Sequence, residues 1–376
     1  MLRIGYDAKR LFNNFTGLGN YSRTLVKDMA TYFPDEAYFL FTPKITNNSE
    51  TSYFLNSPMF EIKHYKGWFK AWWRTRGMAK DILNLDIDLY HGLSHEIPRG
   101  LKHKGVKSVV TIHDLVFKYY PEQYSPIDRI IYDEKFAHAC ENADKIIAIS
   151  ESTKKDIIKF YNTPEEKISV IYQSCGRHFF QEKSDEIKET TRKKYNIPNQ
   201  YYLYVGSIIE RKNLLGIVRA MAQIDKKKLL PLVVIGDGKA YKKRVVEFAT
   251  RHRLMDYVLF RKIAYEDLPA VYQSAHLFIY PSFYEGFGIP VLEALLSETP
   301  VITSNVSSLP EVAGPDSYLV APDDINGLSR AIVEVSSDES LRATMRSKGL
   351  KYAEKFKGDK LAAQHLLTYK SILGIP

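Results

Sequence analysis

The chain has 376 residues, more than one compact core usually holds, which predicts two domains. Hydrophobic residues make up 45% of it and charged residues 26%, as in folded globular proteins, and no apolar run reaches the roughly eighteen residues of a membrane-spanning helix. The net charge of +9 favours an anionic partner, either nucleic acid, an acidic membrane surface or a phosphorylated small molecule.

Short runs rich in Val, Ile and Tyr alternate with helical patterns in the first half of the chain, as in parallel sheets built from βαβ units. Strands are predicted near 2–7, 37–42, 86–90, 106–112, 144–149 and 168–171, and helices near 18–31, 74–84, 126–141 and 151–161. The stretch QEKSDEIKETTRKKYNIPNQ, residues 181–200, is charged and almost without apolar content, which predicts an interdomain linker.

The alternation then restarts. Strands are predicted near 201–205, 231–236, 257–260, 276–280 and 300–303, and helices near 213–223, 239–253, 266–274, 290–297, 324–355 and 359–373. These patterns predict an α/β protein of two doubly wound, Rossmann-like domains facing across a cleft, where ligands of this fold class bind. We expect an N-terminal domain at 1–182, a linker at 183–200, a C-terminal domain at 201–355 and a C-terminal helix at 356–376.

The cysteines and the first residues bear on location. Cys140 and Cys175 are too few for a disulfide framework or the usual zinc site, which favours a reduced, cytoplasmic setting. The start, MLRIGYDAKR, lacks the apolar core of a signal peptide. We therefore expect a cytoplasmic protein.

The first glycine motif is NNFTGLGNYSRTLV, residues 13–26, which places Gly17 and Gly19 between a predicted strand and a predicted helix. Phosphate-binding turns carry glycines at such places, but the G-x-G-x-x-G pattern is incomplete because its last position is Ser22. Glycines that let a substrate approach the backbone, or that only form a turn, explain the motif equally well.

An aromatic and basic segment follows, KHYKGWFKAWWRTRGMAK at 63–80, with all three tryptophans and six Lys or Arg residues. Phe69, Trp72 and Trp73 have the spacing of one helical face. The segment is compatible with contact to anionic lipid, with a wall of an acceptor site or with single-stranded nucleic acid. A helix that packs its aromatics on the core and shows its cations to water is an equal alternative.

Two strand ends carry histidines. In VVTIHDL, residues 109–115, an apolar strand leads directly into His113, and the carboxyl end of a parallel strand faces the ligand-binding side of a sheet. His113 is a candidate for binding sugar hydroxyls or for proton transfer, with a structural role as the alternative. His91, in DLYHGLSHEIP, is interpreted as structural or as lining an acceptor site.

The segment YVGSIIERKNLLGIVRA, residues 204–220, places Arg211 and Lys212 at the carboxyl edge of the second domain's first strand. A helix is predicted to start near Asn213, a candidate N-cap. Two adjacent cations can hold a diphosphate and stabilise it as it leaves. The alternative is an ordinary basic pair on a surface loop.

The segment SFYEGFGIPVLEALL, residues 282–296, places Glu285 and Glu293 on either side of a loop containing glycines and Pro290. Proline suits the first turn of a helix, so amides around 290–292, together with the helix dipole, would favour an anion. We expect Glu293 in that first turn. The alternative is a solvated Glu285, a Glu293 that complements the dipole, and glycines that serve a tight turn.

Together these stretches resemble the retaining nucleotide-sugar transferases of glycosyltransferase family 4, which have the GT-B fold. The resemblance runs from GLGNYS through HDL, GSIIERKN and GDG to FYEGFGIPVLEALL and SNVSSLPEV, and so covers nearly the whole chain. Its most specific element is the glutamate pair in E-G-F-G-x-P-x-x-E, combined with R-K-N upstream.

The resemblance implies that Glu285 lies against the donor sugar, that Glu293 binds the ribose hydroxyls, and that Arg211 and Lys212 bind the diphosphate. From the first domain, His113 would contact the transferred sugar. The remaining donor contacts would come from Gly17 and Gly19 beneath the phosphates, from Gly286, Phe287 and Gly288 at the sugar, and from the amides of Val291 and Leu292 at the phosphates. The last helix would pack back on the N-terminal domain.

Two positions depart from the family pattern. Ser207 stands in the donor site where many members carry arginine, so Arg211 is expected to supply the charge. Glu298 replaces a glycine after the helix, which puts only that turn in doubt.

The motif versions resemble bacterial mannosyltransferases of surface-polysaccharide assembly, which implies GDP-mannose as donor and a saccharide or lipid-linked saccharide as acceptor. The reaction is expected to need no cofactor, and no metal because Arg211 and Lys212 can supply the positive charge that a metal would supply. No nucleic-acid partner is expected, whereas residues 63–80 are a candidate contact with the inner face of the cell membrane. The alternatives are a UDP-sugar donor, a sugar-nucleotide epimerase of the same fold, and a protein that binds anionic membrane or nucleic acid.

Overall fold

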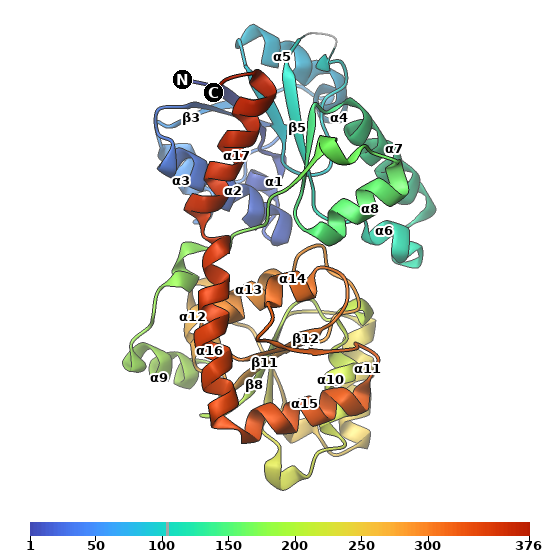
Figure 1. The fold of residues 1–376 in the computed structure, drawn as a ribbon, viewed down its shortest axis with the longest axis vertical. Coiled ribbons are helices and arrows are strands. Elements are labelled where there is room, and N and C mark those ends of the chain that lie inside the picture. Colours follow the sequence, from blue (N-terminus) through green and yellow to red (C-terminus); the bar gives the residue numbers. More distant parts are fainter. Residues whose placement is uncertain (103–104) are drawn as a thin grey trace. The chain divides into compact units, whose positions relative to one another are not determined.

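The structure, a computed structural model, describes residues 1–102 and 105–376. The chain divides into two compact units, unit 1 comprising Met1–Cys175 with Phe356–Pro376 and unit 2 comprising Gly176–Lys355. Each unit is a parallel sheet covered by helices (Figure 1), which confirms the predicted pair of Rossmann-like domains. Among the residues described, no helix combines the length and the apolar character that crossing a bilayer requires.

Unit 1 contains a seven-stranded sheet with the order β3-β2-β1-β4-β5-β6-β7. Its strands are β1 (Arg3–Asp7), β2 (Ala37–Thr42), β3 (Phe60–His64), β4 (Leu89–Gly92), β5 (Lys107–Ile112), β6 (Lys145–Ala148) and β7 (Ile168–Val170). Its helices are α1 (Lys9–Asn13), α2 (Gly17–Tyr32), α3 (Ser52–Asn56), α4 (Lys70–Trp72), α5 (Met78–Asn84), α6 (Val116–Tyr119), α7 (Pro126–Asn142), α8 (Glu151–Tyr161) and α17 (Gly358–Leu373). The strand order reverses between β1 and β4, which makes their carboxyl ends the switch point of this sheet.

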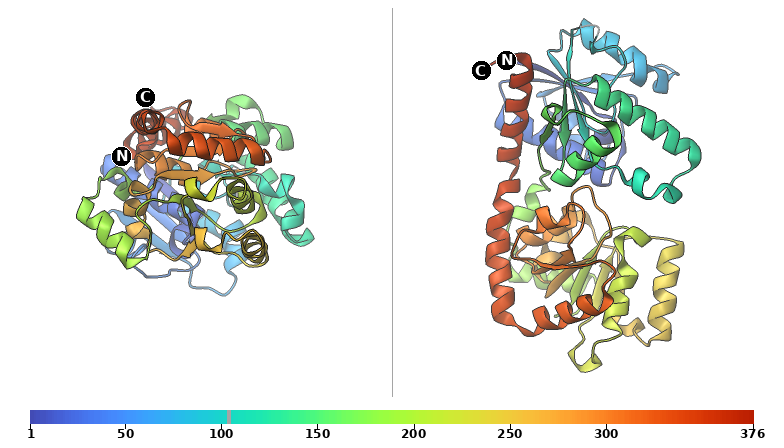
Figure 2. Two further views of the ribbon diagram at one scale, coloured as in Figure 1. Left: turned by 90° about the horizontal axis from the view of Figure 1, so that it is seen from below. Right: turned by 45° about the vertical axis from the view of Figure 1, so that its right-hand side comes forward.

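The C-terminal helix α17 is part of unit 1, where it packs against α2 (Figures 1 and 2). Leu361 and Tyr369 of this helix are buried in the core of the unit. The Tyr369 hydroxyl contacts Nδ1 of the buried His91 at 2.6 Å, and the Thr111 hydroxyl lies 2.8 Å from its Nε2. His91 therefore fastens α17 to the sheet, a structural role.

Unit 2 contains a six-stranded sheet with the order β10-β9-β8-β11-β12-β13. Its strands are β8 (Tyr202–Val205), β9 (Leu232–Ile235), β10 (Val258–Arg261), β11 (Leu277–Tyr280), β12 (Val301–Ser304) and β13 (Tyr318–Val320). Its helices are α9 (Asp185–Lys194), α10 (Leu214–Met221), α11 (Ala240–Arg251), α12 (Leu268–Gln273), α13 (Ile289–Leu296), α14 (Leu309–Ala313), α15 (Ile325–Ser337) and α16 (Glu339–Ala353). Here the order reverses between β8 and β11.

The stretch expected to link the domains, 183–200, instead belongs to unit 2 and contains helix α9. The side chain of Ser184 caps this helix, and Lys194 and the hydroxyl of Tyr195 both contact Oδ2 of Asp267 at 2.7 Å. Its charged composition reflects the solvent-facing side of a helix that packs on α12 rather than an extended connection. The chain passes from unit 1 to unit 2 between Cys175 and Gly176 and returns to unit 1 between Lys355 and Phe356.

Candidate functional site

The switch point of unit 2 brings together two loops that the sequence marked as functional. Arg211 and Lys212 lie after β8, in a 3₁₀ turn, and Glu285 lies after β11. Because β8 and β11 are neighbours in the sheet, their carboxyl ends adjoin, and open α/β sheets bind ligands at such a reversal of strand order. The predicted cations and acid therefore share one site.

Glu285 is held between the two cations. Its Oε2 lies 3.2 Å from Nη1 of Arg211, and its Oε1 lies 3.4 Å from Nζ of Lys212. The hydroxyls of Tyr280 and Ser282 each donate to Oε1 at 2.9 Å. Burial alone would raise the pKa of Glu285, but the charges of Lys212 and Arg211 and these two hydrogen bonds lower it to about 2. The carboxylate is thus ionised and extensively coordinated by the protein.

Two serines hold the loop that contains Glu285. The Ser308 hydroxyl donates to the carbonyls of Glu285 and Phe287, each at 2.8 Å, and the amide of Glu285 donates to the Ser307 hydroxyl at 3.1 Å. Ser307 and Ser308 come from the SNVSS segment after β12, for which the sequence suggested no role. They fix the backbone of the Glu285 loop, so they act as positioning residues.

Asn213 connects three loops at this edge of the sheet. It occupies the N-cap position of α10, as expected, but its side chain makes no capping bond. Its Nδ2 donates instead to the carbonyls of Pro281, at 3.1 Å, and Pro322, at 2.6 Å. The loops after β8, β11 and β13 are therefore fixed relative to one another.

Glycines allow the loops after β8 and β9 to touch. A Cβ at Gly236 would lie 1.9 Å from the carbonyl oxygen of Gly206, and one at Gly238 would lie 2.2 Å from that of Ile208. The amide of Ile208 donates to the carbonyl of Asp237 at 2.7 Å. The GDG sequence is therefore needed to bring these loops together. Ser207 lies in the same loop with an exposed side chain.

Helix α13 begins at Ile289, with Gly288 at the N-cap and Pro290 in the first turn. The amides of Val291 and Leu292 donate to the carbonyl of Gly288 at 2.9 and 3.3 Å. The two amides expected to meet phosphate are therefore engaged in the helix start. Within the described part of the chain, the amide of Ile289 has no hydrogen-bond partner, so it is available to an anion at this helix N-terminus.

Glu293 lies beyond the first turn of α13, not within it as we had expected, because the helix already begins at Ile289. Its side chain faces the protein interior. It is 5% exposed, and its Oε2 accepts a hydrogen bond of 3.0 Å from the hydroxyl of Tyr272. Burial raises its pKa to about 8, although the Tyr272 bond acts in the opposite direction. The side chain therefore exchanges a proton near neutral pH, and ligand hydroxyls that donate to it would favour the charged form.

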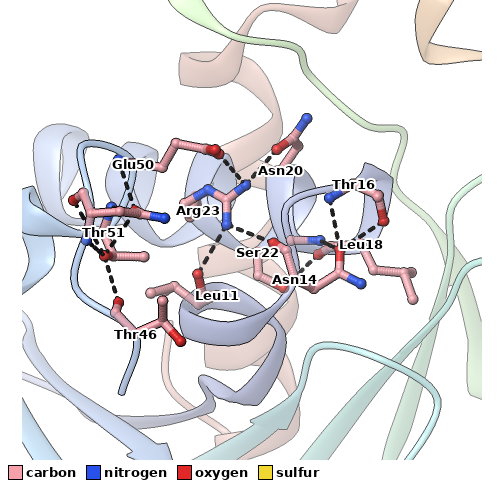
Figure 3. A network of polar contacts seen from close by, with 12 residues as sticks. Leu11, Asn14, Thr16, Leu18, Asn20, Ser22, Arg23, Thr46, Glu50 and Thr51 are labelled. Carbon is pink, nitrogen blue, oxygen red and sulfur yellow. Dashed lines mark hydrogen bonds and ion pairs between the residues drawn. The ribbon is translucent and has the colours of Figure 1, made fainter. Parts of the chain in front are cut away.

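The glycine loop of unit 1 is organised around Asn14 (Figure 3). Its Oδ1 accepts hydrogen bonds from the amides of Thr16 and Gly19 at 3.0 and 3.1 Å, and Arg23 donates to its carbonyl at 2.8 Å. A Cβ at Gly19 would lie 1.6 Å from that carbonyl oxygen, whereas a Cβ at Gly17 would meet nothing within 4 Å. Close packing therefore requires Gly19, and Gly17 marks an open helix start.

His113 lies directly after β5, as predicted, and is 4% exposed. Its Nε2 donates to the carbonyl of Leu93 at 2.8 Å, and its Nδ1 accepts from Nε2 of the Gln173 side chain at 2.9 Å. Burial lowers its pKa to about 4. Both ring nitrogens thus have partners in unit 1, and the ring is neutral. Such a histidine is held in a fixed orientation and can contact a substrate, but it is poorly suited to transfer protons. Its ring packs edge-on against Tyr21 of α2, at 4.6 Å between centroids.

The helical spacing had predicted that Phe69, Trp72 and Trp73 share one face, and this prediction is wrong. Trp73 is 3% exposed, stacks on Tyr65 and donates to Asp81 at 2.6 Å. Phe69 and Trp72 are 76% and 58% exposed. Phe69 precedes helix α4 with a non-helical backbone, at φ −89° and ψ 58°, so it does not lie on the helix. Trp72 and Trp73 are adjacent in a helical backbone, where successive side chains point about 100° apart, so Trp73 faces inward while Trp72 faces solvent.

Two family models match the chain. The model described as "Glycosyl transferases group 1" matches residues 187–352, and the one described as "Glycosyltransferase Family 4" matches residues 17–174. The O-antigen chain mannosyltransferase B of Escherichia coli is 30% identical, over 98% of this chain and 100% of the relative. The O-antigen chain mannosyltransferase RfbU of Salmonella typhimurium is 28% identical, over 60% of each chain.

Solved structures with the same fold cover nearly the whole chain. A glycosyltransferase from Rickettsia africae superposes with a TM-score of 0.78 at 17% identity, over 99% of this chain and 98% of the other. Anabaena Alr3699/HepE, solved in complex with UDP and glucose, superposes with a TM-score of 0.76 at 17% identity, over 99% of this chain and 100% of the other. At an identity of 17%, the similarity to these structures shows a shared fold only.

Proposed function

The chain belongs to the group 1 and family 4 glycosyltransferases, and on this premise we propose that it transfers mannose from GDP-mannose to a hydroxyl of a saccharide or lipid-linked saccharide. The mannosyltransferase names of its E. coli and Salmonella relatives support mannose as the transferred sugar. A UDP-sugar is the alternative donor, which the UDP and glucose complex of Anabaena HepE favours.

The observation that carries this proposal is the position of Arg211 and Lys212 at the switch point of unit 2. Both side chains are largely buried, at 12% and 15% exposure, and both converge on Glu285. Two cations in a partly buried place can neutralise the charge that develops on a departing nucleoside diphosphate. The open amide of Ile289 adds a donor at a helix N-terminus.

We write the reaction with retention at the anomeric carbon. The bond from that carbon to the diphosphate oxygen breaks, the acceptor hydroxyl oxygen bonds to the carbon on the same face, and a phosphate oxygen takes the hydroxyl proton. Glu285 is poorly suited to attack that carbon, because Tyr280, Ser282 and Lys212 already surround its Oε1. In this scheme Glu285 holds Arg211 and Lys212 in position and contacts the donor sugar.

Arg211 and Lys212 also support a reaction without metal, since they supply the positive charge that a divalent cation supplies in other transferases. We propose that chelation with EDTA leaves the rate unchanged. We further propose that the acceptor is reached at a membrane face, through the segment 63–80.

The test is transfer of radiolabelled sugar from a panel of nucleotide sugars into a membrane extract, followed by analysis of the product. We expect label only from GDP-mannose, in a product with the α-configuration of the donor. Release of free sugar nucleotide isomers without an acceptor would instead identify an epimerase, and a β-linked product would contradict retention.

A further inference from the structure

Three aromatic side chains close together in the sequence of unit 1 are exposed to solvent and are not part of its core. Trp68 is 96% exposed, and Phe69 and Trp72 are 76% and 58% exposed, whereas Trp73 beside them is buried. Large aromatic side chains are rarely left so exposed on a monomeric protein unless they bind something. Packing in unit 1 is already provided by Trp73, so these three side chains are available for a partner.

The same segment carries an excess of positive charge. Residues 62–80 contain no Asp or Glu. Of the six cations, Arg74 is held by Asp7 at 2.6 Å and by Glu96, and Lys63 pairs with Glu61 at 2.5 Å. The other four are exposed and have no acidic partner among the described residues. These are Lys66, Lys70, Arg76 and Lys80.

A second apolar surface on α7 adjoins this segment. Ile127 and Ile130 are 70% and 69% exposed, and Ile131 is 42% exposed, at the spacing of one helical face. Figure 1 shows α4 and α7 on the same side of unit 1. A surface hollow of about 340 Å³ lies beside α7 and the π-helical turn Trp73–Gly77 that follows α4; Thr75 and Arg76 of that turn and Ile131 of α7 are among the residues that line it.

The acids of α7 do not offset the free cations. Asp133 is paired with Lys118 at 2.7 Å, and Glu134 with Arg99 at 2.5 Å. Asp128, which accepts a hydrogen bond from the side chain of Ser125, and Glu141 have no cationic partner in an ion pair within the described part of the chain. Four unpaired cations of segment 63–80 thus exceed the two unpaired acids of α7, and the net unpaired charge beside the two apolar surfaces is positive.

We propose that Trp68, Phe69 and Trp72, together with the isoleucines of α7, form one surface that docks on an anionic lipid bilayer. Aromatic rings insert at the boundary between headgroups and acyl chains, while lysine and arginine contact anionic headgroups. Single-stranded nucleic acid would use the aromatic rings and the cations but has no use for exposed isoleucines. The α7 surface thus favours lipid. This inference deepens the proposed membrane contact, yet it concerns unit 1 alone and does not depend on the sugar transferred.

The test is co-sedimentation of the full chain with vesicles of equal parts phosphatidylglycerol and phosphatidylcholine, and with vesicles of phosphatidylcholine alone. We expect binding to the anionic vesicles that weakens as salt is raised, and a blue shift of tryptophan fluorescence. The variant Trp68→Ser/Phe69→Ser/Trp72→Ser should bind at least about tenfold more weakly. The variant Ile127→Ser/Ile130→Ser should also bind more weakly, which a surface limited to segment 63–80 does not predict.

Matched controls are Ile187→Ser and Leu367→Ser, because these side chains are 49% and 66% exposed and lie elsewhere on the chain. Both should sediment like the parent protein. Nucleotide-sugar binding, measured by thermal shift, should be unchanged in every variant, which separates loss of docking from loss of the proposed function. Absence of binding to anionic vesicles at low salt, or equal binding by the aromatic triple variant, overturns the proposal. Displacement of the vesicles by a single-stranded oligonucleotide would assign the surface to nucleic acid instead.

Discussion

Nζ of Lys212 and Oε1 of Glu285 lie 3.4 Å apart at the switch point of unit 2. Arg211 approaches the other carboxylate oxygen at 3.2 Å, so one acid holds two cations in place. The cluster keeps one positive charge in excess, which suits the binding of a diphosphate. Although Glu285 is itself negative, it favours binding of an anion at this site, because it fixes the two cations in position before the ligand binds.

Replacing Lys212 with alanine removes one of the two cations that face the proposed leaving group. We expect kcat/KM for sugar transfer to fall by about a hundredfold, because a charge placed for the transition state is lost. Lys243→Ala is the control, since that lysine is 81% exposed on α11. A Lys212→Ala enzyme with the rate of the control would remove Lys212 from the site.

Glu285→Gln tests the charge cluster through acid stability. A depressed pKa of about 2 means that ionised Glu285 stabilises the folded state above its unfolded pKa, near 4.5, and that this contribution is lost as the pH falls toward 2. The variant should be less stable at neutral pH by roughly 3 kcal/mol, with the difference shrinking in acid. Guanidinium unfolding at neutral pH and near pH 3 measures this, and a difference that does not vary with pH would contradict it.

Glu293→Gln should have the opposite pH dependence. Because the pKa of Glu293 is raised to about 8, the favourable contribution of its neutral form is complete below pH 4.5 and is lost as the pH rises through 8. The ligand-free variant should therefore melt at a higher temperature than the parent at about pH 8.5, and at a similar temperature near pH 5. A variant that is less stable at both values would show that Glu293 is ionised and satisfied in the fold.

The same Glu293→Gln variant should lose the stabilisation that a nucleotide sugar gives the parent protein. The amide can still accept a hydrogen bond, but it lacks the charge with which a carboxylate holds two ribose hydroxyls. Thermal shift with and without GDP-mannose separates this effect from the change in intrinsic stability. An undiminished shift would remove Glu293 from the nucleotide site.

The two glycines of the first loop should respond differently to alanine. Gly19→Ala places a methyl group 1.6 Å from the carbonyl oxygen of Asn14, so it should destabilise unit 1 by more than about 2 kcal/mol. Gly17→Ala meets no atom within 4 Å and should fold normally. Thermal unfolding of both variants checks this, and equal effects would contradict the packing of the loop.

The two central sheets could be predicted because their strands are buried on both faces and appear as short apolar runs. The sequence did not indicate β3 and β13, which lie at the edges of their sheets. Each has a single neighbouring strand and is only partly buried, so its residues show no clear hydrophobic pattern. Backbone hydrogen bonds to a strand that is distant in the sequence stabilise it instead. Helix α9 was not predicted because most of its side chains are charged and exposed, so the few that pack on the protein give no apolar pattern in the sequence.

At the site, Arg211, Lys212 and Glu285 could be predicted because charged residues at strand ends have few structural uses. Ser307 and Asn213 could not, since both act through backbone atoms of loops distant in the sequence. Positive φ angles of 52° and 56° mark both positions, and such angles are a property of the folded chain. The orientation of Phe69 likewise depends on the helix beginning only at Lys70, which the spacing of the aromatic residues does not reveal.

The central claim is that the loops after β8 and β11 bind a nucleoside diphosphate sugar. Titration calorimetry of the parent protein and of Lys212→Ala with GDP-mannose, UDP-glucose and GDP tests it most directly. We expect GDP-mannose to bind the parent more tightly than UDP-glucose does, and its affinity to fall at least about tenfold in the variant. Failure of every nucleotide to bind, or equal affinity of the two proteins for GDP-mannose, would contradict the account.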